Sequence, residues 1–87
     1  NLRELQLSAN GIADIGVLTG MEALQLLTLQ MNQVQDIAPL VANLGLGFND
    51  VVRLTGNPLN PDALCSGIPT LEARGVVVEV DQACSIP

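Results

Sequence analysis

The sequence predicts an α/β fold: a right-handed solenoid with a short parallel β-sheet on its concave face and short helical or 3₁₀ turns on its convex side. A motif, L-x-x-L-x-L-x-x-N, occupies residues 2–10 and recurs in residues 24–32, at an offset of 22 residues. Apolar and polar residues alternate within each copy, which is typical of a strand with one buried face. A unit of this length cannot bury its own apolar face, so successive copies must stack.

The first two copies agree beyond the motif, and this agreement extends the prediction to the segments between the strands. Four further positions recur at the same offset: Ile12 with Val34, Asp14 with Asp36, Ile15 with Ile37, and Leu18 with Leu40. These return segments are too short for long helices. We therefore expect short helical or 3₁₀ turns around residues 14–20 and 36–42.

Two further copies follow, and both depart from the motif. Residues 52–57 match residues 27–32 at an offset of 25, so the preceding loop, residues 43–49, holds three extra residues. Asn49 replaces the leading leucine, and two glycines in this stretch suit a loop. The fourth copy, over residues 76–80, has lost its asparagine. Regular repeat geometry is therefore expected only up to residue 43.

The motif asparagines, Asn10, Asn32 and Asn57, are expected to stack at the bend that follows each strand. A buried amide needs hydrogen-bond partners for its oxygen and its NH₂ group. Backbone groups of adjacent turns can supply them. The three side chains are therefore predicted to form a ladder of hydrogen bonds along the stack.

The chain changes character after the third copy. Residues 1–59 are predicted to form the repeats, about three starting mid-array, and residues 60–87 a C-terminal capping segment. Asn60 is a suitable N-cap, Pro61 fits the first helical position, and the charge of Asp62 favours a helix N-terminus. A helix is therefore expected to begin at this point.

The rest of the capping segment is predicted to hold a second short helix and the last strand. This helix restarts at Pro69 and stops at Gly75, which suits a left-handed residue after a helix. A strand over residues 76–80 then closes the sheet.

The repeated motif, continued in the first two copies as Asn-x-Ile/Val-x-Asp-Ile-x-x-Leu, resembles the leucine-rich repeat family across nearly the whole chain. The 22-residue form resembles the repeats of bacterial internalins and is similar to that of a eukaryotic regulator of protein phosphatase. The first resemblance implies an extracellular or cell-surface protein, and the second implies a cytoplasmic alternative. Either resemblance implies a repeat protein whose concave face binds other proteins.

Composition excludes several classes of function. The 87 residues include 3 basic and 9 acidic ones, a net charge of −6, and the chain has no His, Lys, Trp or Tyr. Catalytic sites that require histidine, and Schiff-base or P-loop chemistry that requires lysine, cannot be built. Three arginines do not form the basic patch that nucleic acid requires. No apolar run approaches the ~20 residues of a membrane span. We expect no catalysis, no cofactor, no nucleic-acid binding and no membrane insertion.

Residues that alternate with the inward leucines are expected on the concave face. Three columns are predicted there: Glu4, Leu26 and Val51; Gln6, Thr28, Arg53 and Val77; and Ser8, Gln30, Thr55 and Glu79. Apolar members with a polar rim suit a protein interface, although an ordinary exposed sheet face would look the same. The residues predicted to bind a protein partner are Gln6, Leu26, Thr28, Gln30, Val51, Arg53 and Thr55.

Asp14 and Asp36 occupy the same position in successive copies. Two neighbouring carboxylates could contribute to a calcium site, which takes 6–8 oxygen ligands. Each also precedes a predicted turn and could instead cap it by accepting a backbone hydrogen bond. We predict that Asp14 and Asp36 cap these turns and do not form a calcium site. Other carboxylate pairs, such as Asp50 with Asp62 or Glu72 with Glu79, have no predicted pocket that could make them catalytic and are interpreted as solvated charge.

Neither Cys65 nor Cys84 occupies a core position of the repeat, and Cys84 lies in a polar tail. We predict a disulfide between them that holds the tail over the last copy. Such a bond favours an oxidising compartment. Two reduced thiols are the alternative; a zinc site would lack ligands, because the chain has no histidine and no further cysteine.

The predicted function is a non-catalytic module that binds a protein through its concave face. The alternatives are a structural spacer or stalk in a larger surface protein, and a scaffold appended to an enzyme domain. The first copy has no polar cover for its outer edge, so upstream repeats or another chain are expected to cover it.

Overall fold

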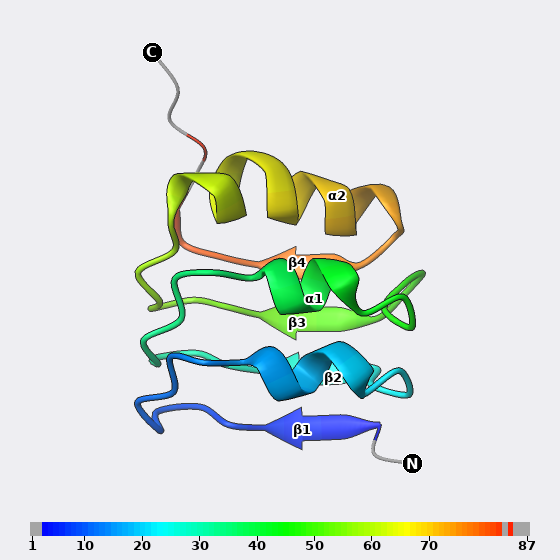
Figure 1. Ribbon diagram of the computed structural model, residues 1–87, viewed down its shortest axis with the longest axis horizontal. Helices are drawn as coiled ribbons and strands as arrows, with labels where there is room; N and C mark the ends of the chain where they lie inside the picture. Colours follow the sequence, from blue (N-terminus) through cyan, green and yellow to red (C-terminus); the bar gives the residue numbers. More distant parts are fainter. Residues whose placement is uncertain (1–2, 83, 85–87) are drawn as a thin grey trace.

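The computed structural model describes residues 3–82 and 84 and is a mixed α/β fold with an all-parallel, four-stranded sheet. The strands are adjacent in chain order, so each strand pairs with the next one along the sequence (Figure 1). Their bounds are β1, Glu4–Gln6; β2, Leu26–Thr28; β3, Val51–Arg53; and β4, Val77–Glu79. The parallel sheet predicted from the repeated motif is confirmed.

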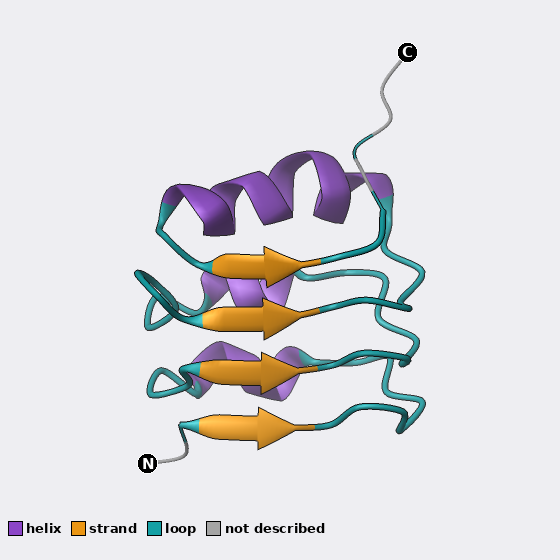
Figure 2. Ribbon diagram, turned by 180° about the vertical axis from the view of Figure 1, so that it is seen from behind, coloured by secondary structure: helices purple, strands orange, loops and turns teal. Residues whose placement is uncertain are grey.

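Short helices connect the strands. The 3₁₀ helix η1 and the α-helix α1 fall within the turns expected at 14–20 and 36–42, and a π-helical segment, η2, leads into α2. Their bounds are η1, Gly16–Gly20; α1, Ala38–Ala42; η2, Ala63–Gly67; and α2, Ile68–Ala73. Helices η1 and α1 lie behind the sheet in Figure 2, and α2 packs beside β4 at one end. In the described part of the chain, no helix crosses the front face of the sheet in this view.

The buried core lies between the sheet and the return segments and consists almost entirely of Leu, Ile and Val side chains. Leu27 and Leu29 of the second copy and Val52 and Leu54 of the third have no exposed surface. Burial of each such side chain contributes about 1.5–3 kcal/mol relative to leaving it in water. The same positions in β1 are only half-buried, because β1 lies at the edge of the sheet.

The asparagine ladder forms as predicted for the second and third copies. Asn32 is 2% exposed; its Nδ2 donates to the oxygens of Leu7 and Leu29, both at 2.9 Å, and its Oδ1 accepts from two backbone N–H groups of the first copy. Asn57 is equally buried and donates to the oxygens of Leu29 and Leu54. Asn10 differs, since it is exposed and donates only to a backbone oxygen two residues away. The ladder therefore links the first copy to the second, and the second to the third.

The register of the first three strands matches the offsets of 22 and 25 residues, with Leu5 opposite Leu27 and Leu27 opposite Val52. The predicted columns were wrong at β4. Val77 pairs with Val51, and Glu79 pairs with Arg53, so both lie two residues from the expected position.

The error at β4 has a physical origin. A shift of two residues leaves the same side chains on the same face, so alternation of apolar and polar residues cannot detect it. Backbone hydrogen bonds set the register instead. Asn49 N–H donates to Gly75 O at 3.1 Å, and Val77 N–H donates to Asp50 O at 2.7 Å.

Residues 61–73 form one continuous helical run, so the two separate short helices predicted in the capping segment were wrong. Helix does not restart at Pro69, because Gly67 and Ile68 are already helical. Pro69 has no N–H to continue an α-helical pattern, and a wider turn precedes it. In that turn the Ile68 N–H donates to Ala63 O, five residues back. The predicted N-cap is confirmed, since Asn60 Oδ1 accepts from Ala63 N at 2.8 Å.

The predicted stop at Gly75 is confirmed. Gly75 has φ +92°, a left-handed conformation that glycine adopts without a steric cost. Its N–H donates to Glu72 O, and the N–H of Val76 donates to Leu71 O, which is the Schellman pattern. Leu71 and Val76 are both buried, so the end of the helix is joined to the core immediately before β4.

A third buried asparagine, Asn43, holds the other end of the return segments and was not predicted. It has no exposed surface; its Nδ2 donates to Leu18 O at 2.8 Å and to Met21 O at 3.0 Å. Arg74 extends this arrangement, since its guanidinium donates to Val41 O at 2.7 Å. Carbonyl groups where η1 and α1 end therefore receive side-chain donors, from Asn43 at η1 and from Arg74 at α1.

The predicted disulfide is confirmed: Cys65 of η2 is bonded to Cys84, 19 residues later. Gln82 also binds the tail to the body of the protein by donating to Asn57 O. Residue 83 and residues 85–87 lie outside the described residues. The tail is thus attached to the loop after β3 through Gln82 and to η2 through the disulfide.

Candidate functional site

The front face of the sheet brings the seven predicted contact residues together. Core residues of each strand point toward the helices, so the alternate residues occupy the opposite, uncovered face (Figure 2). We refer to this surface as the open sheet face. It consists of two rows that run across the strands and a third row in the turns that follow them, and each row has a different chemical character.

The first row is apolar over three strands. Leu26 pairs with Val51, and Val51 pairs with Val77, at the point where each strand begins. Leu26 and Val51 are half-buried, and Val77 is 48% exposed. Glu4 continues the row on β1. A row of aliphatic side chains with a carboxylate at its end can contact apolar surface of another molecule.

The second row contains an ion pair that the sequence columns did not predict. Arg53 Nε lies 3.4 Å from Glu79 Oε1, with the two side chains 40% and 49% exposed. Nε has no hydrogen-bond partner in the described residues, so the contact is an ion pair without a directed hydrogen bond. At this exposure the pair is worth about 0.2–1 kcal/mol. Arg53 is therefore partly neutralised and is not a free positive charge on the face.

Thr28, at the centre of the second row, is buried, whereas simple alternation predicts that it is exposed. It is 6% exposed, and its Oγ1 has no hydrogen-bond partner in residues 3–82 and 84. Its row neighbours are Gln6, which is exposed, and Arg53, which is half-buried. Leaving a buried hydroxyl unpaired costs about 1–3 kcal/mol. The centre of the open sheet face is thus a polar group without a partner.

The third row is polar. Ser8 Oγ donates to Gln30 Oε1 at 3.0 Å, so these two side chains are connected across the first and second copies. Thr55 follows in the third copy and is half-buried. The row provides hydroxyl and amide groups beside the ion pair, which is the composition of a polar rim.

The two aspartates at the start of the turns serve as caps. Asp14 Oδ1 accepts from Gly16 N at 2.9 Å, and Asp36 Oδ1 accepts from Ala38 N at 2.8 Å. Each carboxylate therefore pairs an N–H group of the first helical residue. In the part of the chain that the structure describes, no three His, Cys, Asp or Glu side chains gather as a metal site.

The other carboxylates named from the sequence have different surroundings and make different contacts. Asp50 Oδ2 accepts from Gly47 N at 2.9 Å and so closes the loop before β3. Glu79 pairs with Arg53, whereas Glu72 and Asp62 are exposed on the helical run. The interpretation as solvated charge agrees with the exposed positions of Asp62 and Glu72, whereas Asp50 and Glu79 make structural contacts.

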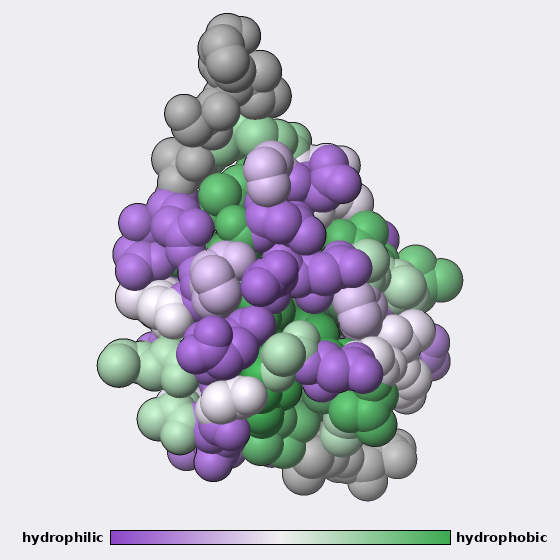
Figure 3. Space-filling model, turned by 60° about the vertical axis from the view of Figure 1, so that its left-hand side comes forward, coloured by the Kyte–Doolittle hydropathy of each residue, from purple (hydrophilic) through white to green (hydrophobic). Residues whose placement is uncertain are grey.

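Two exposed apolar side chains in the 43–49 loop were not named as candidate contacts. Phe48, the one aromatic residue of the chain, is 81% exposed, and Leu44 is 77% exposed. Asn49 in the same loop is bonded to Gly75, next to β4, which places the loop at the edge where the strands begin. The feature of the sequence that could have pointed to these two side chains is the three extra residues of the loop. Figure 3 turns the opposite edge, where the strands end, toward the viewer and shows hydrophilic side chains interspersed with hydrophobic ones.

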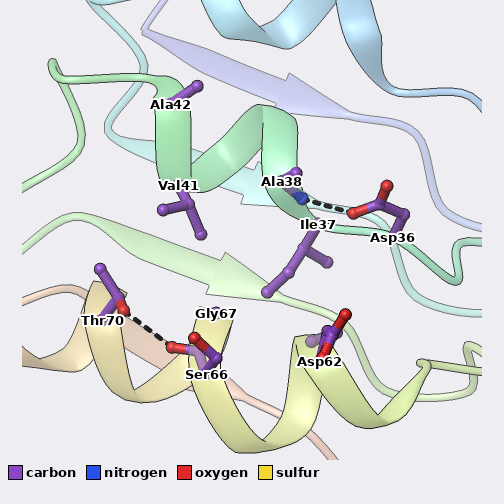
Figure 4. Close-up of a pocket in the computed structure, with 10 residues that line it drawn as sticks. Asp36, Ile37, Ala38, Val41, Ala42, Asp62, Ser66, Gly67 and Thr70 are labelled. Atoms are coloured by element: carbon purple, nitrogen blue, oxygen red, sulfur yellow. Dashed lines mark hydrogen bonds between the residues drawn. The ribbon is translucent and has the colours of Figure 1, made fainter.

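A groove lies on the helical side, away from the open sheet face. It runs between α1 and the η2–α2 run and has a volume of about 620 Å³. Figure 4 shows Ile37, just before α1, and Val41 of α1 facing Ser66 and Thr70 across it. None of the predicted contact residues lines this groove.

No protein-family model matches the chain, and no curated protein is significantly similar to it in sequence. Over residues 3–82 and 84, the structure contains no helix of the length and apolar character that a membrane crossing requires.

Proposed function

We propose that the chain is part of a leucine-rich repeat solenoid and acts as a non-catalytic protein-recognition module. Its contact surface is the open sheet face, which would be the concave face of the solenoid. Strands in chain order, offsets of 22 and 25 residues between paired strands, and the asparagine ladder support the repeat assignment. Each successive copy then adds a residue to the rows of the face.

The observation that carries the proposal is the arrangement of the open sheet face around Thr28. An aliphatic row, Leu26, Val51 and Val77, lies beside a row whose central hydroxyl is buried and has no partner among the described residues. Protein interfaces combine an apolar centre with hydrogen-bonding groups at the rim. A partner that covers the aliphatic row would remove its apolar surface from water, while the polar groups of the third row would hydrogen-bond at the rim.

The disulfide supports an extracellular or cell-surface setting for this module. Bonds of this kind persist in oxidising compartments and are rare in the cytosol, where thiols are kept reduced.

The test is capture of a partner from the native source, followed by titration calorimetry of the purified partner against three variants. Val77→Glu and Arg53→Gln alter the first and second rows at exposed or half-exposed positions. Val17→Glu is the matched control, because Val17 is 77% exposed on η1, away from the face. Loss of tenfold or more in affinity for Val77→Glu, with Val17→Glu unchanged, is the expected result.

A partner whose affinity is indifferent to Val77→Glu and Arg53→Gln would contradict the proposal. The spacer or stalk alternative predicts that result, because its sheet face contacts nothing in particular. A circular dichroism spectrum of each variant separates loss of binding from loss of fold.

A further inference from the structure

The groove on the helical side has the properties of a second binding site. Its floor is apolar, formed by Ile37, which is 1% exposed, and by the half-buried Val41. Its volume of about 620 Å³ lies within the range of sites that bind small ligands or short peptide segments. Its lining residues come from α1, the residues just before it, and the η2–α2 run, so the groove exists only where these segments are packed together.

Small side chains create the groove. A Cβ atom at Gly67 would lie 2.8 Å from Ile37 Cδ1, so glycine allows the two helices to approach closely. Beyond this contact the helices present Ala38, Ala42 and Ala63, which do not fill the space between them. The close contact at the floor and the short side chains at the walls together leave an open channel.

Two carboxylates lie at the same end of the groove. Asp36 and Asp62 are both exposed and lie on its opposite walls, as Figure 4 shows. Asp36 caps α1 through Oδ1, which leaves Oδ2 free for another interaction. Asp62 makes no capping bond to η2. An apolar channel with a negatively charged end complements a ligand with an apolar part and a positive charge.

The net charge of the whole chain also favours a positively charged ligand. The net charge is −6, and two of the three arginines are already engaged. Arg53 pairs with Glu79 on the other side of the sheet, and Arg74 donates to backbone oxygens. An approaching cation is therefore attracted by the protein as a whole, and the local pair of carboxylates determines where it binds.

We propose that this groove binds a short peptide segment of a partner protein in which a basic side chain lies next to an aliphatic one. The aliphatic side chain packs on Ile37 and Val41, and the ammonium or guanidinium group lies between Asp36 and Asp62. The exposed Ser66 hydroxyl, on the wall of the groove, can bind the peptide backbone. This site lies on the side opposite the open sheet face and does not depend on the function proposed for that face.

The test uses N-acetyl-Trp-Leu-Arg-amide and the ¹⁵N-labelled full chain with its disulfide intact. Because the chain has no Trp or Tyr, fluorescence anisotropy reports the peptide alone. Amide chemical shifts measured in the same titration identify the surface that binds. We expect shifts confined to residues 36–42 and 61–70, with a dissociation constant of about 1 mM or below.

Charge variants with a matched control test the role of the carboxylates. Asp36→Asn and Asp62→Asn are each expected to raise the dissociation constant about two- to fivefold, the range for exposed ion pairs. Asparagine retains an acceptor oxygen, so the cap on α1 is preserved. Asp14→Asn is the control, because Asp14 makes the same capping bond one copy earlier and does not line the groove. It should leave the dissociation constant unchanged.

Several results would overturn the proposal. They are equal binding of N-acetyl-Trp-Leu-Glu-amide, an equal effect of Asp14→Asn and Asp36→Asn, and the absence of any shift with the arginine peptide. Calcium chloride alone giving the same shifts around Asp36 and Asp62 would reassign the carboxylates to a metal ion. Shifts on the open sheet face instead of the groove would refute this site and leave the function proposed for that face standing.

Discussion

Replacement of Asn32 by alanine tests whether the asparagine ladder holds the copies together. Three backbone groups depend on this side chain: the N–H groups of Asn10 and Ile12 and the oxygen of Leu7. The Leu29 oxygen keeps a second amide donor and is not orphaned. Each buried group left unpaired costs about 1–3 kcal/mol, and these three are partly buried, so we expect a loss of about 2–4 kcal/mol in the free energy of unfolding.

The matched control is Asn10→Ala, the same substitution one copy earlier. Asn10 is exposed and donates only to Ser8 O at 3.2 Å, so its replacement should change the free energy of unfolding by no more than about 0.5 kcal/mol. Urea denaturation followed by far-ultraviolet circular dichroism measures both variants, since the chain has no tryptophan. Equal effects of the two substitutions, or a loss below about 0.5 kcal/mol for Asn32→Ala, would refute the reasoning. An unfolded Asn32→Ala protein beside a folded Asn10→Ala protein would agree with it.

Three further predictions concern the core, the close approach of the loop and the disulfide. Leu29→Ala should cost about 2–5 kcal/mol in urea denaturation, because Leu29 has no exposed surface; an unchanged midpoint would show that it is not a core residue. Gly45→Ala should lower the melting temperature and Gly20→Ala should not. A Cβ at Gly45 would lie 2.1 Å from a backbone oxygen, whereas one at Gly20 would meet nothing within 4 Å; equal melting temperatures would contradict this close approach. Cys84→Ser should cost about 3 kcal/mol by opening the loop to Cys65, measured against the oxidised protein, and dithiothreitol should then have no further effect on the variant.

Sequence alone determined the features that depend on a repeated local pattern. The offset of 22 residues places Leu5 opposite Leu27 and predicts a parallel sheet, because identical short units can bury their apolar faces only by stacking. The ladder of Asn32 and Asn57 follows from the same repeat. Gly75 was predictable because a left-handed residue after a helix favours glycine.

Only the tertiary structure decided how the last strand, the face and the groove are arranged. The pairing of Arg53 with Glu79 depends on a register that alternation cannot detect, since a shift of two residues preserves the pattern. Burial of the Thr28 hydroxyl depends on its neighbours on adjacent strands. The groove depends on contact between two helices separated along the chain, and neither its small residues nor Asp36 and Asp62 form a pattern within one copy. Periodicity specifies which face a residue occupies, and packing between distant segments specifies what it meets there.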